Sequence, residues 1–534
     1  MSNALGRDLA RLAAAAERAA AERGHGDFGQ RLHVMPPTGW LNDPNGLCQT
    51  PDGVFHAFFQ YAPFDVAGGL KLWGHAVSRD LLSWDYLGAP LLPDEPYDCH
   101  GAYSGSALVE DGRIKVLYTG NVKLASEPGA PAFDYVNRGR RANTVLAEGA
   151  WDPSDPAGFS FSAKRAVMSN DDYPADLTCH VRDPKIWRGA DGRAYMVQGA
   201  RRRVEAEPVA SRFSALHGAG AGADAGEALV FSSDDLVHWR LENRVRTSER
   251  LGFMWECPDY LELPVTGADG AGADAGGAGD AALRVLSISP QGLEGGRWER
   301  GNIYQSGYLP VRGDLLGDAR LGDFRLWDAG FDFYAPQTFL ARDGRRVMIP
   351  WMGIPDEPSY GNDPTVAVGW QHCLGIPREL TAAADGTVRQ RPVREVEAMR
   401  AAGRAAVGTL EVEGEAARCF DLAIEAGEGR ALAGCRVTVA GELALSVLPA
   451  GDGLPARLEM RFLDASRDAA GCGRTVRWEP LDGARDLRVI GDSSSVEVFA
   501  ADGALAMSTR IYPRRRSVAV SAPGARVRFW ELHR

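Results

Sequence analysis

Three carboxylates of this sequence lie in similar surroundings and could do acid–base or nucleophilic chemistry. They are Asp43 in GWLNDPNGL, Asp183 in VRDPKIW and Glu256 in MWECPDY. Each stands within two residues of a proline and within three residues of a tryptophan or an arginine. Taken singly, each has a plain structural explanation, because NDPNG is typical of a turn and the other two fit a strand end or a solvated edge.

The segments around these carboxylates recur along the chain. Asp-Gly pairs at Asp52, Asp111, Asp191 and Asp343 each separate two alternating segments, which is typical of β-hairpins. A fifth such pair of segments, DYLELPV and LRVLSISPQG, has the Gly/Ala/Asp-rich stretch 266–281 in place of the turn. The segment SRDLLSW also returns as SDDLVHW. This repetition predicts an all-β fold with a five-bladed β-propeller, and a β-sandwich with many hairpins is the alternative.

The spacing between acids and turns predicts that the acids converge. Asp43 stands nine residues before Asp52, Asp183 stands eight before Asp191, and Glu256 opens the fourth repeat. Equivalent strands of radially repeated blades meet at the same end of the central channel, so NDPNG is expected to be an active-site turn. Converging acids favour glycoside hydrolysis, in which one carboxylate attacks or stabilises the anomeric carbon and one carboxylic acid protonates the leaving oxygen.

Composition and charge narrow the class of protein. The 534 residues, 45% hydrophobic and 24% charged, describe a soluble globular chain of two or more domains. The net charge of −12 argues against nucleic acid or an anionic membrane as the main partner. Eight cysteines are scattered without zinc-ligand spacing, so we expect reduced thiols, no metal and no cofactor.

The first residues include RDLARLAAAAERAAAERG, which could be mistaken for a secretion signal. Charged residues interrupt the apolar run, and its Ala, Leu, Arg and Glu favour a solvated helix that ends near Gly24. No later run is long enough to span a bilayer. We therefore expect a cytoplasmic protein with a short N-terminal helix and a sugar as its partner, and a homo-oligomer is left open.

Nine motifs occur in a fixed order along the chain. They are WLNDPNG, WGHAVSRDLLSW, YSGSA, YTGN, RDPKIW, WECPDY, YAPQTF, PREL and DSSSVEVF. Together they resemble those of glycoside hydrolase family 32, the invertases and sucrose-6-phosphate hydrolases, over about residues 30–534. The last is similar to the family's C-terminal D-x-S-x-x-E-x-F signature. The resemblance implies a five-bladed β-propeller followed by a C-terminal β-sandwich.

The expected domains follow from this resemblance and from the repeats. They are an N-terminal helical extension at 1–29, a catalytic propeller at 30–375, a linker at 376–405 and a β-sandwich at 406–534. Two low-complexity stretches, 201–227 and 264–282, are predicted to be disordered surface insertions.

The resemblance also implies a role for each acid. Asp43 would be the nucleophile, Glu256 the general acid/base, and Asp183 the transition-state stabiliser that holds the fructosyl hydroxyls. The implied activity is that of a retaining β-fructofuranosidase, which cleaves terminal β-D-fructosides by double displacement through a fructosyl-enzyme intermediate. Residues expected to bind the substrate are Trp40, Leu41, Asn42, Gln60, Trp73, Tyr103, Ser104 and Arg182.

Physical reasoning adds expectations about the pocket. The backbone N–H groups of its turn would keep Asp43 ionised. Trp73 and Tyr103 would wall a blind pocket that admits only a chain terminus. Basic residues nearer the rim could meet a 6-phosphate on the leaving sugar; the candidates are Lys71, His100, Lys123 and Arg138.

Two other functions remain open from the sequence. An inverting arabinan- or xylan-acting hydrolase is one, because related five-bladed enzymes also use three acids. A catalytically silent carbohydrate-binding protein is the other. The sequence does not choose between sucrose, sucrose 6-phosphate and fructo-oligosaccharides as the natural substrate.

Overall fold

The computed structural model is built almost entirely from β-strands. It describes residues 3–124, 136–137, 139–205, 211–217, 219–266, 282–357, 361–464 and 475–533. The α-helices among these residues are α1 (Ala4–Arg23), α2 (Ser214–His217) and α3 (Asp363–Val366). The all-β class predicted from the sequence is therefore confirmed.

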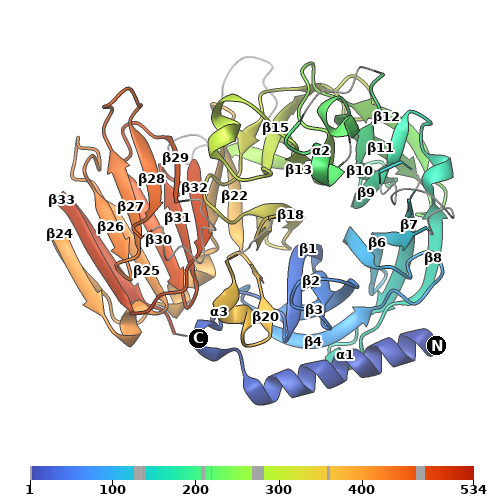
Figure 1. Cartoon of the computed structure of the whole chain (residues 1–534), viewed down its shortest axis with the longest axis horizontal. Coiled ribbons are helices and arrows are strands. Elements are labelled where there is room, and N and C mark those ends of the chain that lie inside the picture. The colour runs from blue at the N-terminus through green and yellow to red at the C-terminus, as the bar shows by residue number, and fades with distance from the viewer. Residues whose placement is uncertain are drawn as a thin grey trace.

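The N-terminal helix α1 has the boundaries that its sequence predicts. The Asn3 side chain caps its start by accepting the N–H of Gly6, and Gly24 ends it with a φ of 68°. The helix lies beside strand β4 (Asp85–Leu91), where Tyr86 donates a hydrogen bond to Glu17 (Figure 1). This contact attaches the extension to the first sheet.

Strands that follow one another between residues 39 and 245 pair antiparallel in three sheets, and β20, from later in the chain, joins the first of them in parallel. The first sheet runs β20 (Trp370–Gln371), β1 (Gly39–Gln49), β2 (Phe55–Ala62), β3 (Leu72–Ser78), β4. The second contains β5 (Ala102–Glu110), β6 (Arg113–Lys123), β7 (Arg140–Ala150) and β8 (Ser162–Met168). The third contains β9 (Leu177–Arg188), β10 (Ala194–Arg202), β11 (Ala225–Ser233) and β12 (Arg240–Val245).

Two further groups of strands share one hydrogen-bonded sheet. One group is β13 (Met254–Thr266), β14 (Ala282–Gln291), β15 (Gly307–Arg312), β16 (Arg320–Leu321) and β17 (Arg325–Leu326). The other is β18 (Tyr334–Leu340), β19 (Arg346–Met352), β21 (Cys373–Leu374), β22 (Arg378–Ala383) and β23 (Val388–Pro392). The end of β13 joins the groups by pairing with β22.

These groups surround a common centre, as in a propeller (Figure 1). β1 contacts β5, β5 contacts β9, β9 contacts β13, β13 contacts β18, and β18 contacts β1. We call these five strands the inner ring. The ring is fastened by β20, which pairs with the start of β1 although more than 300 residues separate them.

Each strand of the inner ring is distorted at the same point. The pairing register breaks between Leu41 and Pro44, Ala102 and Gly105, Arg182 and Lys185, Glu256 and Asp259, and Tyr334 and Gln337. Such bulges re-aim side chains and are common beside active sites. All three predicted acids lie at these breaks.

The segment NDPNG does not reverse the chain, so the predicted turn is wrong. Residues 39–49 are one strand, and its pairing with β2 breaks twice, before Pro44 and before Cys48. Gly46 has a φ of 52°, and a Cβ there would lie 2.8 Å from the Phe58 ring. Proline and glycine therefore distort this strand without ending it.

The predicted hairpins are confirmed. The four Asp-Gly turns connect β1 to β2, β5 to β6, β9 to β10, and β18 to β19. The fifth pair of segments forms the hairpin β13–β14, whose stretch 267–281 lies outside the described residues. The related SRDLLSW and SDDLVHW segments form equivalent turns, in which Trp84 and Trp239 each donate to the backbone oxygen three residues earlier.

Two stretches of the chain differ from expectation. Within 201–227, the described residues include the ends of β10 and β11 and the helix α2, and Phe213 is fully buried, so they are not a disordered insertion. Within 376–405, strands β22 and β23 complete the sheet of β19 instead of forming a free linker. In the first stretch, pairing with distant strands outweighs weak local patterning. In the second, Asp385-Gly386 connects β22 and β23 as a further Asp-Gly hairpin.

The last part of the chain forms a sandwich with its own apolar core. Its strands are β24 (Arg404–Glu413), β25 (Phe420–Glu425), β26 (Arg436–Val439), β27 (Leu443–Leu448), β28 (Arg457–Phe462), β29 (Val476–Pro480), β30 (Asp486–Asp492), β31 (Ser495–Ala500), β32 (Leu505–Arg510) and β33 (Ser517–Glu531). The long strand β33 pairs with β26 along its first half and with β25 along its second. It thereby belongs to both layers.

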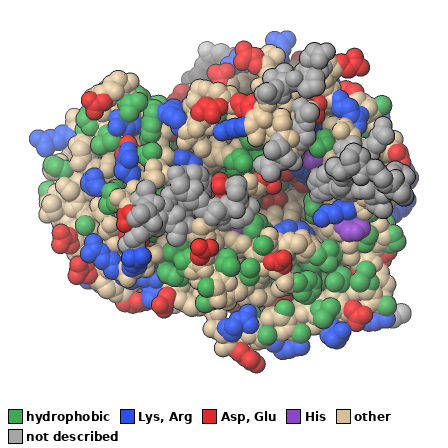
Figure 2. Space-filling model, viewed as in Figure 1, with side chains coloured by type: hydrophobic (Ala, Val, Ile, Leu, Met, Phe, Trp, Pro, Cys, Tyr) green, Lys and Arg blue, Asp and Glu red, His purple; other side chains and the backbone are tan. Residues whose placement is uncertain are grey.

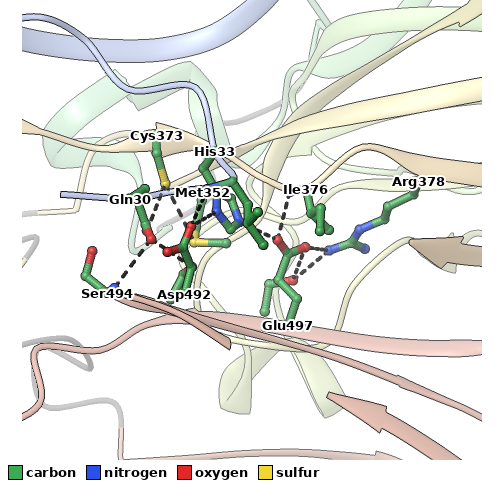
Figure 3. A network of polar contacts seen from close by, with 12 residues as sticks. Gln30, His33, Met352, Cys373, Ile376, Arg378, Asp492, Ser494 and Glu497 are labelled. Atoms are coloured by element: carbon green, nitrogen blue, oxygen red, sulfur yellow. Dashed lines mark hydrogen bonds and ion pairs between the residues drawn. The ribbon is translucent and has the colours of Figure 1, made fainter. Parts of the chain in front are cut away.

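A buried polar network holds the sandwich against the propeller (Figure 3). We call His33, Arg378, Asp492 and Glu497 the junction network. His33 Nδ1 lies 2.8 Å from Asp492 Oδ2, and His33 Nε2 lies 3.0 Å from Glu497 Oε1. Arg378 Nη2 donates to Glu497 Oε2 at 2.6 Å. The acids of the signature DSSSVEVF therefore join the N-terminal segment, the propeller and the sandwich.

The remaining features of the chain are its cysteines, any membrane helices or metal ligands, and its surface charges. Seven cysteines are free thiols, and Cys472 lies outside the described residues. Among the residues described, no helix is long and apolar enough to cross a membrane, and no His, Cys, Asp and Glu side chains group as metal ligands. Acidic and basic side chains are interspersed over the face shown in Figure 2.

Candidate active site

Asp43 lies in the first break of β1, where residues from three strands of the inner ring meet. Its Oδ2 accepts hydrogen bonds from Ser104 Oγ at 2.5 Å and from Gln60 Nε2 at 3.2 Å. Cys257 Sγ lies 3.6 Å from the same oxygen. Ser104 belongs to β5 and Cys257 to β13, so the ring brings them to Asp43 across 61 and 214 residues of sequence.

A chain of hydrogen bonds orients this carboxylate. Trp40 Nε1 donates to Asn42 Oδ1 at 2.9 Å, and Asn42 Nδ2 donates to Gln60 Oε1 at 2.9 Å. Gln60 Nε2 in turn lies 2.5 Å from Ser104 Oγ. The structure thus brings together five of the residues that the sequence analysis singled out.

Asp183 occupies the equivalent break of β9 in a strained conformation. Its φ is 64°, in the left-handed region that residues other than glycine rarely adopt. Its N–H donates to Thr119 Oγ1 at 2.9 Å, and its Oδ2 accepts the N–H of Cys257 at 3.0 Å. These bonds from neighbouring strands hold the Asp183 carboxyl beside Asp43.

Glu256 is held by two side chains. Arg182 Nη2 donates to its Oε1 at 2.5 Å, and the Tyr334 hydroxyl donates to its Oε2 at 2.7 Å. Arg182 Nε also lies 3.8 Å from Asp183 Oδ2. Arg182 therefore links two of the three acids.

Burial dominates the electrostatics of the two aspartates. It raises the pKa of Asp43, the hydrogen bond from Ser104 opposes this, and the charge of Glu256 adds to it. It raises the pKa of Asp183 to about 7, against the attraction of Arg182. The hydrogen bond that favours the ionised form of Asp43 thus comes from the Ser104 side chain, while burial and the charge of Glu256 act against it.

Two residues expected to line the pocket instead support it. Leu41 and Trp73 are 0% exposed. Leu41 packs in the core behind β1, whereas Trp73 Nε1 donates to the backbone oxygen of Tyr103 at 3.0 Å. Tyr103 itself is partly exposed. A sugar could therefore contact Tyr103 but not the side chains of the other two.

The four basic candidates for a phosphate contact differ in position. Lys71 is half-buried, with Nζ 4.8 Å from the centre of the Trp40 ring. His100 and Lys123 are exposed. Arg138 lies outside the described residues.

The sequence analysis did not assign a role to Tyr334. It stands immediately before Ala335-Pro336, as Glu256 stands before Cys257-Pro258, so alignment of the repeats on their prolines would have found it. Behind it, the rings of Tyr304 and Tyr334 lie 6.3 Å apart. Tyr304 donates to Asp356 at 3.1 Å and also bonds His217. No sequence signal marks these last two residues.

Three carboxyls with different partners, set in a buried and aromatic-lined end of the ring, have the composition of a glycoside hydrolase site. Such enzymes need one carboxylate near the anomeric carbon and one carboxylic acid near the leaving oxygen. The described residues supply both within a network of hydrogen bonds.

Family comparisons agree with this class. The model described as "Glycosyl hydrolases family 32 N-terminal domain" matches residues 33–214 and 207–392, and "Glycosyl hydrolases family 32 C terminal" matches residues 461–530. The chain belongs to glycosyl hydrolase family 32. The resemblance inferred from the nine motifs is thus confirmed, and the protein is a glycoside hydrolase.

Individual relatives extend over nearly the whole chain. A sucrose-6-phosphate hydrolase of Klebsiella pneumoniae is 36% identical over 90% of this chain and 88% of its own. A raffinose invertase of Escherichia coli is 32% identical over 94% and 93%. A solved sucrose-6-phosphate hydrolase of Lactobacillus gasseri superposes with a TM-score of 0.76 at 25% identity, covering 97% of this chain and 96% of that one.

Proposed function

We propose that the protein is a retaining β-fructofuranosidase that cleaves terminal β-D-fructosides by double displacement. In this mechanism Asp43 attacks the anomeric carbon while Glu256 protonates the leaving oxygen, which forms a fructosyl-enzyme ester. Glu256 then removes a proton from water, which hydrolyses the ester and frees fructose. Asp183 binds sugar hydroxyls beside the reacting carbon.

The observation that carries this proposal is the different bonding of Asp43 and Glu256. Asp43 Oδ2 accepts two neutral hydrogen bonds, from Ser104 and Gln60, which orient a nucleophile without neutralising it. Glu256, on β13, is bound by Arg182 and Tyr334, which lie on the two ring strands that flank β13. Two carboxyls with distinct partners suit two distinct roles.

The same proposal extends to architecture and mode of action. We infer five blades, one behind each strand of the inner ring, because the ring closes from β18 to β1. Side chains fill the middle of such a ring, so Asp43 lies in a blind pocket that favours exo-cleavage. Sucrose, sucrose 6-phosphate and short fructo-oligosaccharides are the proposed substrates, in a cytoplasmic protein that needs no metal or cofactor.

The test is product analysis on purified protein. Fructose should be released from sucrose or its 6-phosphate, and NMR of the first product should show the β-anomer before mutarotation. First appearance of the α-anomer would refute retention. Binding of the sugars without release of fructose would support a silent carbohydrate-binding protein instead.

Long inulin tests the mode of action separately. An exo-acting enzyme should release free fructose from it, slowly and without intermediates. Accumulation of oligosaccharides would contradict the blind pocket.

A further inference from the structure

Lysine is rare in this chain, and Lys71 stands apart from the others. Only five of the 59 basic residues are lysines. Lys115, Lys164 and Lys185 each form an ion pair with an acid, and Lys123 is exposed. Lys71 is half-buried, yet among the described residues its ammonium group forms no hydrogen bond and no ion pair.

The position of the Lys71 ammonium group is nevertheless fixed. Its backbone oxygen accepts the N–H of Ala102 at 2.8 Å, which ties the start of β3 to the start of β5. Its Nζ lies over the Trp40 ring, 4.8 Å from the ring centre, in cation–π contact. The same indole donates a hydrogen bond to Asn42, and Asn42 is connected to Asp43 through Gln60.

Two glycines lie next to the Lys71 side chain. Gly68 has a φ of 108°, and a Cβ there would lie 3.5 Å from Lys71 Nζ. Gly101 has a φ of 140°, and a Cβ there would lie 2.8 Å from the Tyr103 ring and 3.5 Å from Lys71 Cβ. Neither position carries a side chain that could cover the space around Lys71 and Tyr103.

The charges near Lys71 act at longer range. Burial lowers the pKa of Lys71 to about 7, and the carboxylates of Asp43 and Asp65 oppose this shift without reaching ion-pair distance. A half-buried ammonium group with no bonded acid gains most from a ligand that brings its own negative charge.

We propose that Lys71 is a specificity-determining residue that binds a phosphate monoester carried by the leaving sugar. The inference deepens the proposed function and rests on it. A phosphate monoester carries close to two negative charges at neutral pH and offers three acceptor oxygens to the three donors of an ammonium group. The contact lies beside Trp40 and Tyr103, next to the Asp43 hydrogen-bond chain.

Kinetics on two substrates test the proposal. The Lys71→Met variant should lose about 10- to 100-fold in kcat/KM for sucrose 6-phosphate, mostly through KM, and change sucrose turnover by less than about threefold. The Lys71→Arg variant keeps the charge and should keep most of the preference. Lys115→Met, which removes a lysine at the far end of β6, is the matched control and should change neither substrate.

Inorganic phosphate separates recognition of the phosphate group from recognition of the whole sugar. It should inhibit sucrose hydrolysis competitively in the wild type and at least about tenfold more weakly in Lys71→Met. Equal inhibition of both proteins would overturn the proposal.

The remaining outcomes are also decisive. If Lys71→Met lost the same activity on sucrose and on sucrose 6-phosphate, Lys71 would support Asp43 electrostatically and would not bind phosphate. If the variant lost no activity on either sugar, Lys71 would have no role in binding. Either result overturns the proposal. If wild-type protein releases no fructose from either sugar, the proposed function itself fails. A melting curve that matches the wild type shows that the variant is folded.

Discussion

In the candidate active site, Asp43 and Asp183 have raised pKa values, whereas in the junction network Asp492 and Glu497 have lowered ones. Both pairs of acids lie in strands and are largely removed from solvent. The difference lies in their partners. The site acids face one another and mostly neutral donors, while the junction acids face His33, Arg378 and backbone N–H groups.

The junction acids are bonded at nearly every oxygen. Asp492 accepts the N–H groups of Arg31 and Leu32 as well as the ring of His33. Glu497 accepts the N–H of Ile376 at 2.8 Å in addition to its two cationic partners. Burial alone lowers the pKa of His33, but its hydrogen bonds to both acids outweigh burial and raise it to about 9.

The comparison shows how one residue type serves two purposes. Buried carboxylates that are fully paired hold domains together, because breaking such a pair leaves an uncompensated charge. Buried carboxylates that are only partly paired stay chemically available, at a cost in stability. Variants of the two regions should therefore differ in whether they lose activity or stability.

Asp43→Asn should abolish catalysis while leaving the fold at least as stable. Loss of the nucleophile should lower kcat for sucrose by about 10⁴-fold or more. The neutral amide also removes a carboxyl whose ionisation is disfavoured by burial, so the melting temperature should stay equal or rise. Fructose release and thermal unfolding measure the two effects. Near-normal turnover would show that Asp43 is not the nucleophile.

Glu256→Ala should impair the site less completely. Loss of a general acid lowers turnover of sucrose by about 10²- to 10⁴-fold, and activated leaving groups should suffer least because they need no proton. Azide should partly restore activity by attacking the fructosyl-enzyme without help from a base. If the variant hydrolysed sucrose at nearly the wild-type rate, the assignment of the acid would be wrong.

Glu497→Gln should produce the opposite pattern in the junction network. Removing one member of a buried ion pair costs about 3–5 kcal/mol, because His33 and Arg378 lose a charged partner. The melting temperature should fall, while kcat/KM of the folded protein stays within about twofold. Glu425→Gln, which breaks an exposed pair with Arg528, is the control and should cost under about 1 kcal/mol. A catalytic loss without a loss of stability would contradict this division.

The stability of the protein should depend on pH in different ranges for the candidate active site and for the junction network. His33 has a folded pKa of about 9, above its ordinary 6.5, so its contribution is complete below 6.5 and is lost as the pH rises through 9. Asp183 has a folded pKa of about 7, above its ordinary 3.8. The stability that protonated Asp183 contributes is therefore lost as the pH rises from 3.8 to 7.

Two variants assign these windows through melting temperatures measured across the pH range. Asp183→Asn should flatten the loss of stability between about pH 4 and 7, and His33→Gln should flatten the loss between about 6.5 and 9. Unchanged pH profiles would show that neither group titrates as its surroundings imply.

The sequence identified three candidate acids and the repeat that brings them together. Asp43 and Asp183 were recognisable because they stand beside a proline, nine and eight residues before a hairpin turn, and Glu256 was recognisable because it opens the fourth repeat. The hairpins and the helix α1 were predictable for a similar reason, since Asp-Gly turns, alternation and capping act within a few residues.

The sequence did not predict the structure of two segments whose conformation depends on strands far away in the chain. NDPNG is typical of a turn, but the residues before and after it both pair with β2, so the segment forms two bulges within one strand. The interval 376–405 contains a further Asp-Gly turn at Asp385-Gly386, but only the pairing of β22 with β19 shows that this hairpin completes a propeller sheet. Both outcomes depend on a neighbouring strand that the local sequence does not contain.

The surroundings of each acid were likewise decided only by the tertiary structure. The sequence determined which carboxyls are present and that three of them converge. It did not determine that Ser104 bonds Asp43, that Tyr334 bonds Glu256, or that Asp492 and Glu497 enclose a histidine more than 450 residues away. The protonation of an acid depends on its burial and on charges a few ångströms away, and only folding creates that burial and those distances.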